Sequence, residues 1–147
     1  MKTKFPPVLL FLITAFLMWV IAQFAVFALP KLTALAVVMA FLGFLVMALG
    51  GLALKQAGTT HNYATPQASN QLVVKGIYRY SRNPMYLGLA LILSAWALYL
   101  GQGLVWLFVV GFVAYLTHFQ IKPEEAVLSQ TFGQSYQAYR QTTRRWL

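Results

Sequence analysis

The only two acidic side chains in this chain are the neighbours Glu124 and Glu125, set against eleven Lys and Arg residues. They follow directly after the last long apolar stretch of the sequence. Carboxylates attract a cationic ligand, and the attraction strengthens where water is scarce. Alternatively, acidic residues in a first helical turn offset the helix macrodipole, a role worth about 0.3–1 kcal/mol that one Glu fulfils. The pair indicates a candidate cation site at a membrane surface.

A second candidate segment covers residues 76–88, which read Gly-Ile-Tyr-Arg-Tyr-Ser-Arg-Asn-Pro-Met-Tyr-Leu-Gly. Within it, Asn83 is expected to cap a helix through its side chain, and Pro84 to occupy the first helical position. Its arginines are also suited to reach lipid phosphates, as long basic side chains do. Clustered tyrosines are less well explained this way, although Tyr is common at membrane interfaces. The residues alone leave structural and ligand-binding interpretations equally open.

Composition places these motifs in a membrane protein. The chain is 60% hydrophobic and 9% charged, whereas soluble domains carry about 25% charged residues. The net charge is +9, and the basic residues that produce it flank the apolar stretches. This arrangement favours contact with anionic lipid over nucleic acid. The absence of cysteine excludes disulfides, and two carboxylates with two His make a dedicated metal site improbable.

Four apolar stretches predict an all-α, polytopic bundle of about four transmembrane helices with a cytoplasmic or interfacial C-terminal helix. A bilayer requires about 20 apolar residues per helix, and the stretches cover residues 7–29, 32–54, 84–100 and 104–121. Glycines in the second allow close helix packing and permit a homodimer. We expect one domain over residues 1–147, with two helices in 5–54, a loop at 55–83, a helical hairpin at 84–121 and a further segment at 122–147.

In that last segment, four residues spaced by four, four and three positions predict one face of an amphipathic helix. These are Leu128, Phe132, Tyr136 and Tyr139. Ten of the eleven basic residues fall on one side of the expected spans, and only Lys31 falls on the other. The positive-inside rule therefore places both termini and the 55–83 loop in the cytoplasm. The hairpin then brings residues 82–84 close to the glutamate pair.

Together these segments resemble the isoprenylcysteine carboxyl methyltransferase and phospholipid methyltransferase superfamily of integral membrane enzymes. The resemblance covers about residues 55–147. Asn83 stands where eukaryotic members carry His, so a step that depends on His does not transfer. Similarity to bacterial members implies an inner-membrane location with a cytoplasmic active site. The residues that carry the motif are Gly76, Tyr78, Arg82, Asn83, Pro84, Tyr86, Gly88, Glu124 and Glu125.

The resemblance implies S-adenosylmethionine as cofactor, held between the hairpin ends and the 122–147 segment. Glu124 or Glu125 would face its cationic groups, and Glu125 is favoured. Asn83 and Tyr86 would supply hydrogen bonds, Tyr78 a wall for the adenosine, and Arg82 a partner for the cofactor carboxylate. Gly76 and Pro84 would shape the same cofactor segment.

The methyl acceptor is expected to be amphiphilic, such as a prenylated cysteine or a phospholipid, and to approach sideways from the bilayer. Methyl transfer depends mainly on positioning and desolvation. Arg145 or Arg144 would hold an anionic acceptor. Two alternatives stay open: a membrane reductase that uses a nicotinamide cofactor, and a non-enzymatic module whose basic face binds anionic lipid.

Overall fold

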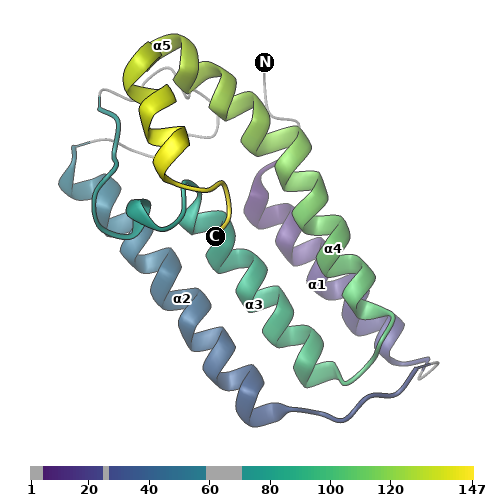
Figure 1. The fold of residues 1–147 in the computed structure, drawn as a ribbon. Helices are drawn as coiled ribbons and strands as arrows, with labels where there is room; N and C mark the ends of the chain where they lie inside the picture. The colour runs from purple at the N-terminus through teal and green to yellow at the C-terminus, as the bar shows by residue number, and fades with distance from the viewer. Residues whose placement is uncertain (1–4, 25–26, 59–70) are drawn as a thin grey trace.

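A computed structural model describes residues 5–24, 27–58 and 71–147, and within these ranges it is all-α, as the sequence predicts (Figure 1). The prediction for residues 59–70 of the 55–83 loop lies outside the described residues. The only strand-like feature in the described part is an isolated bridge between Ala28 and Gln102. The helices are α1 (Pro7–Ala22), α2 (Thr33–Gln56), the 3-10 helix η2 (Gly76–Arg79), α3 (Pro84–Leu100), α4 (Val105–Tyr115), the π-helix η3 (Leu116–Ile121) and α5 (Lys122–Thr142).

Helix α3 is the centre of the bundle, with α2 on one side and α1 and α4 on the other (Figure 1). Its buried face meets α1 and α4 in a wholly apolar core. Burial of such side chains stabilises helix packing through dense van der Waals contact. The core comprises Met18, Tyr86, Leu89, Leu93, Ala97, Val105, Val109, Phe112, Leu116 and Ile121.

Helices α2 and α3 approach backbone to backbone through glycine. A Cβ atom on Gly43 would lie 2.8 Å from the Gly88 carbonyl oxygen, and one on Gly88 would lie 2.6 Å from the Gly43 carbonyl oxygen. Gly50 packs against Pro84 in the same interface. Small residues that permit this approach are typical of membrane helix pairs. This confirms the expected close packing at Gly43 and Gly50, whereas Gly51 faces open space.

The outer surface of the bundle is apolar. Phe41 of α2 is 66% exposed and Phe16 of α1 is 60% exposed, among many other large apolar side chains. Helix α2 and the continuous stretch Val105–Thr142 are long and apolar enough to cross a bilayer. Helices α1 and α3 have 16 and 17 residues, which at 1.5 Å per residue gives about 24–26 Å, short of a 30 Å hydrocarbon core.

The expected first span, residues 7–29, is too long because α1 ends at Ala22. The chain then meets the turn that follows α3, where the backbone N–H of Phe27 donates to the Gln102 side-chain oxygen at 2.9 Å. Gly101, with φ of 63°, ends α3. Residues 101–103 form the turn between α3 and α4, which pack against each other.

Candidate functional site

The two glutamates lie in the first turn of α5 beside Pro123, and α5 continues directly from the π-helix that follows α4. Proline lacks an N–H group and clashes with the carbonyl four residues earlier in an α-helix. The π-helix Leu116–Ile121 precedes it, and its wider turn lets the helix continue into α5. Glu124 and Glu125 are 8% and 7% exposed. Side chains at successive helical positions point about 100° apart, so the two glutamates face different partners.

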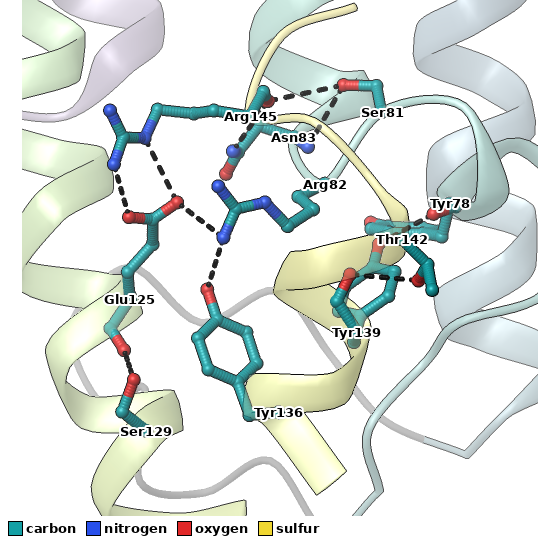
Figure 2. A network of polar contacts seen from close by, with 10 residues as sticks. All are labelled: Tyr78, Ser81, Arg82, Asn83, Glu125, Ser129, Tyr136, Tyr139, Thr142 and Arg145. Carbon is teal, nitrogen blue, oxygen red and sulfur yellow. Dashed lines mark hydrogen bonds and ion pairs between the residues drawn. The ribbon is translucent and has the colours of Figure 1, made fainter. Parts of the chain in front are cut away.

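Glu125 is paired with two arginines. Arg145 forms a two-pronged contact, with Nε 3.0 Å from Oε1 and Nη2 2.7 Å from Oε2. Arg82 Nη1 lies 3.1 Å from the same Oε1 atom. The hydrogen bond to Glu125 raises the pKa of Arg145, so this arginine stays charged. Figure 2 shows Glu125 between the two guanidinium groups. A buried carboxylate so matched satisfies its charge within the protein.

Two of the partners of Glu124 are the uncharged donors Tyr86 and Gln120. The Tyr86 hydroxyl donates to Oε1 at 2.7 Å, and the side-chain amide of Gln120 donates to the same oxygen. Glu124 lies just beyond Ile121, the last residue of the apolar stretch. Burial raises the pKa of Glu124 from 4.5 to about 7, and the hydrogen bonds from Tyr86 and Gln120 offset part of this effect. Its carboxyl group is therefore poised between charged and neutral forms near neutral pH.

Residues 143–147 return across the start of α3 as an extended segment. The Arg144 carbonyl accepts from the backbone N–H of Arg82 at 3.0 Å. The Arg145 carbonyl accepts from the Asn83 side-chain amide at 3.0 Å. The indole N–H of Trp146 donates to the Thr117 hydroxyl at 3.1 Å. This segment therefore ties the first turn of α3 to the end of α4.

Asn83 occupies the N-cap position of α3, but the predicted capping hydrogen bond is absent. Its side chain is bound to the returning segment instead. The Ser81 hydroxyl accepts from the backbone N–H of Asn83 at 3.1 Å, a local turn contact that Ser commonly makes. Pro84 is in the first helical turn, as expected.

Gly133 makes the return possible. It has φ of 51° and ψ of −121° inside α5, a conformation open to glycine and strained for other residues. Helix α5 bends (Figure 1), so the expected helix is present but kinked, and its four face residues do not lie on one straight helix. The second half of α5 packs on the segment before α3: the Tyr139 hydroxyl donates to the Tyr78 carbonyl at 2.6 Å. The Tyr136 hydroxyl accepts from Arg82 Nη1 at 3.5 Å.

Most of the expected site residues converge, but three lie at its margin. Gly76 is exposed at the start of η2 with φ of 62°. Tyr78 is buried, and its carbonyl anchors Tyr139. Arg144 contributes its carbonyl, while its side chain is exposed. In the described ranges, no group of three or more His, Cys, Asp or Glu residues is arranged to hold a metal.

The sequence analysis placed neither Gln120 nor Tyr136 in the site, although both belong to this network. Gln120 lies four residues before Glu124, so the two share a helix face, and this spacing could have identified it. Tyr136 was placed only on the face of an amphipathic helix, because the break at Gly133, which changes the direction in which it points, was not expected.

Comparison with known proteins places this geometry in a family. The sequence profile of the phospholipid methyltransferase family matches residues 31–135. This chain belongs to the phospholipid methyltransferase family. The match covers most of the chain, from α2 into the first half of α5, including both glutamates and the first turn of α3. The protein is therefore a membrane methyltransferase by family.

One similar protein is an uncharacterized protein of Haemophilus influenzae, 51% identical over 63 residues. The matched stretch covers 43% of this chain and all of that protein. No solved structure matches the chain. The relative carries no activity in its name, so the roles of individual residues rest on the geometry above.

Proposed function

We propose that the protein transfers a methyl group from S-adenosylmethionine to an amphiphilic acceptor at the membrane, either an isoprenylcysteine-like carboxylate or a phospholipid-like group. The observation that carries the proposal is the meeting of two motifs about 40 residues apart. Tyr86 lies 2.7 Å from Glu124, and Arg82 lies 3.1 Å from Glu125. Because the chain belongs to a methyltransferase family, we interpret this contact between the two motifs as part of a cofactor site.

The charged residues of the site are complementary to the charges of the cofactor. When bound, S-adenosylmethionine supplies a methyl group on a cationic sulfur. Sequence reasoning favoured Glu125 for that cation, but Glu125 already faces Arg82 and Arg145. Glu124, which accepts hydrogen bonds from Tyr86 and Gln120, is the second candidate. A cation beside it would favour its charged form, as opposite charges do at short range.

The chain's own residues also exclude water. Tyr86, Ile121 and Leu116 are almost fully buried beside the glutamates. Removing water strengthens the attraction between a carboxylate and a cation. Gln120 and Tyr86 fix the orientation of the Glu124 carboxyl group. These residues position the reacting groups and need not take part in bond formation.

Of the two arginines expected to hold an anionic acceptor, Arg144 is the better placed. The Arg145 guanidinium is occupied by Glu125. The Arg144 side chain is exposed next to the site and, in the described part of the chain, forms no ion pair. A guanidinium suits recognition of a carboxylate or phosphate. The acceptor would approach from the bilayer side of α3.

The test is a methylation assay on purified protein in lipid nanodiscs. The protein is incubated with methyl-deuterated S-adenosylmethionine and a bacterial lipid extract, and products that gain the label are identified by mass spectrometry. We expect a labelled lipid in wild type and a loss of at least tenfold in Glu124→Gln. Binding of a nicotinamide cofactor with no labelled product would instead favour the reductase alternative.

A further inference from the structure

An apolar groove runs along the bundle between α1 and α2, with α3 as its floor. Helices α1 and α2 pack chiefly on α3 rather than on each other (Figure 1), so a strip of α3 is left between them. The groove has a volume of about 370 Å³, within the range of small-ligand sites. Residues that mark its extent are Phe11 and Ala15 of α1, Thr33 and Ala40 of α2, and Ile92 and Tyr99 of α3.

The width of the groove decides what can occupy it. Its lining on α2 extends from Thr33 to Ala40, which is about 10 Å of helix at 1.5 Å per residue. The volume of about 370 Å³ over that length leaves a cross-section of about 35 Å². An α-helix with its side chains is at least about 10 Å across, or roughly 80 Å². A hydrocarbon chain, whose carbon atoms pack at about 4 Å, needs roughly 20 Å². The groove therefore fits one hydrocarbon chain and is too narrow for a transmembrane helix.

Aromatic side chains hold the end of the groove that lies away from the glutamates. The indole N–H of Trp96 donates to the Ala15 carbonyl at 3.1 Å, which fixes the ring between α3 and α1. Tyr99 stacks on Trp96, with ring centroids 5.5 Å apart and an interplanar angle of 17°. Tyr99 is 47% exposed, and its hydroxyl forms no hydrogen bond with the described residues. This end of the groove therefore offers a free hydroxyl on a positioned ring.

Lys31 adds a positive charge at the same end. Its Cγ atom packs on Gly101, the residue that ends α3, where an added Cβ would lie 2.8 Å away. The side chain is exposed. The only carboxylate side chains of the protein, Glu124 and Glu125, lie beside the other end of α3. Lys31 is also the single basic residue on its side of the expected spans, so it is the one cation available to an anionic group on that face.

We propose that the groove binds one acyl chain of a phospholipid on the membrane face opposite the glutamates, with the lipid phosphate between Lys31 and the Tyr99 hydroxyl. Phosphate oxygens accept from both donors. Lipid chains are as apolar as the helix surface, so the chain gains only packing in the groove, and the phosphate contacts fix its position. The bound lipid fills the space between α1 and α2.

This lipid site is separate from the candidate methyltransferase site and does not depend on the cofactor. Tyr99 lies 13 residues beyond Tyr86 in α3, a distance of about 20 Å along the helix. A ligand that binds only the folded protein stabilises it, so the lipid should support the bundle where α1 and α2 leave α3 uncovered.

The experiment compares phosphatidylglycerol with a diacylglycerol that carries the same chains and no phosphate. Both have a photoreactive diazirine in one chain. The full chain is purified in detergent, stripped of lipid and titrated with each ligand, and crosslinked residues are identified by mass spectrometry. Crosslinks should concentrate in residues 33–40 and 92–99. Phosphatidylglycerol should half-saturate these positions at about fivefold lower concentration, as expected for one lysine beside an anionic lipid.

Two matched pairs of variants test the two ends of the lipid. Lys31→Gln should remove most of the difference between the two ligands, whereas Lys55→Gln, in the last turn of α2, should preserve it. Ala40→Phe fills the groove and should abolish most crosslinking with both ligands, whereas Ala48→Phe, on the exposed surface of α2, should not. If Ala40→Phe does not fold, Val37→Phe fills the groove from a wall position that is 64% exposed.

Three results would overturn the proposal. The first is crosslinking spread evenly over the outer surface of α2, which indicates bulk lipid. The second is equal half-saturation by the two ligands in wild type, which removes the phosphate contact. The third is a dimer that Ala40→Phe abolishes, with no lipid in the groove, which assigns the groove to a second copy of the chain. None of these results bears on the methylation assay.

Discussion

Glu125→Gln should destabilise the protein, whereas Glu124→Gln should mainly reduce cofactor affinity. Glu125 is paired with Arg82, and each of these side chains is 9% exposed. Removing one partner of a buried pair costs about 3–5 kcal/mol, because the other charge is left buried and unmatched. Arg145 is 30% exposed and can be solvated, so its share is smaller. Gln keeps an acceptor oxygen, so the expected loss of unfolding free energy lies near the lower end of this range.

That loss is large for a protein of this size. Roughly 3 kcal/mol corresponds to a fall of about 6–12 °C in the midpoint of thermal unfolding. Unfolding is followed in detergent by intrinsic tryptophan fluorescence, to which Trp146 contributes from the returning segment. Limited trypsin digestion adds a local measurement. Release of Arg145 from Glu125 should expose residues 143–147 and speed cleavage after Arg144.

Glu124→Gln is the matched variant, identical in chemistry and one position away. It removes a buried carboxyl group with a raised pKa, so stability at neutral pH should hold or rise slightly while S-adenosylmethionine affinity falls. The opposite result would refute the assignment of Glu125 to stability and of Glu124 to cofactor binding. If Glu125→Gln unfolds at the wild-type temperature and resists trypsin, yet loses the cofactor, then Glu125 is the ligand and its arginine pairs are not structural.

Three further predictions concern protonation and glycine. Folding favours protonated Glu124, because its pKa rises from 4.5 to about 7 in the folded protein. The free energy of unfolding should therefore fall by up to roughly 3 kcal/mol as the pH rises from 4.5 to 7. Denaturant titrations at several pH values should show that Glu124→Gln removes this pH dependence. Gly88→Ala forces a Cβ to 2.6 Å from the Gly43 carbonyl and should cost about 1–3 kcal/mol in thermal unfolding, whereas Gly51→Ala, which meets open space, should not destabilise. Gly133→Ala places a side chain at a strained φ of 51°, so it should lower the free energy of unfolding by about 1–3 kcal/mol and weaken cofactor binding measured by calorimetry. Gly111→Ala, with no atom near its added Cβ, should have neither effect.

Local rules were enough to predict the helices and the meeting of the two motifs. Apolar length, Asn83-Pro84 and the glycine turn at residues 101–103 each act over a few residues, and together they determine the hairpin of α3 and α4. The cytoplasmic end of this hairpin brings Arg82 close to Glu125. The close approach of Gly43 and Gly88 follows from residue size in the same way.

The returning segment could not be predicted, because it depends on contacts between distant positions. Arg82 and Asn83 bind the carbonyls of Arg144 and Arg145, 62 residues later in each case. No pattern in the sequence distinguishes the π-helix or the turn at Gly133 from a regular α-helix. Asn83 makes no capping hydrogen bond for the same reason, since its side-chain amide donates to the distant Arg145 carbonyl and the side chain is oriented toward that segment.

Arg82 is the residue at which fold and function cannot be separated. It contacts Glu125, Tyr136 and, through its backbone, Arg144, so a change there disturbs the returning segment as well as the candidate site. Glu124 and Tyr136 are different, because Gln and Phe at these positions remove one chemical function and keep the packing. A fall in affinity at Arg82 alone therefore says little about ligand contact. A fall in cofactor affinity in Glu124→Gln, with thermal unfolding unchanged, would instead identify a ligand contact.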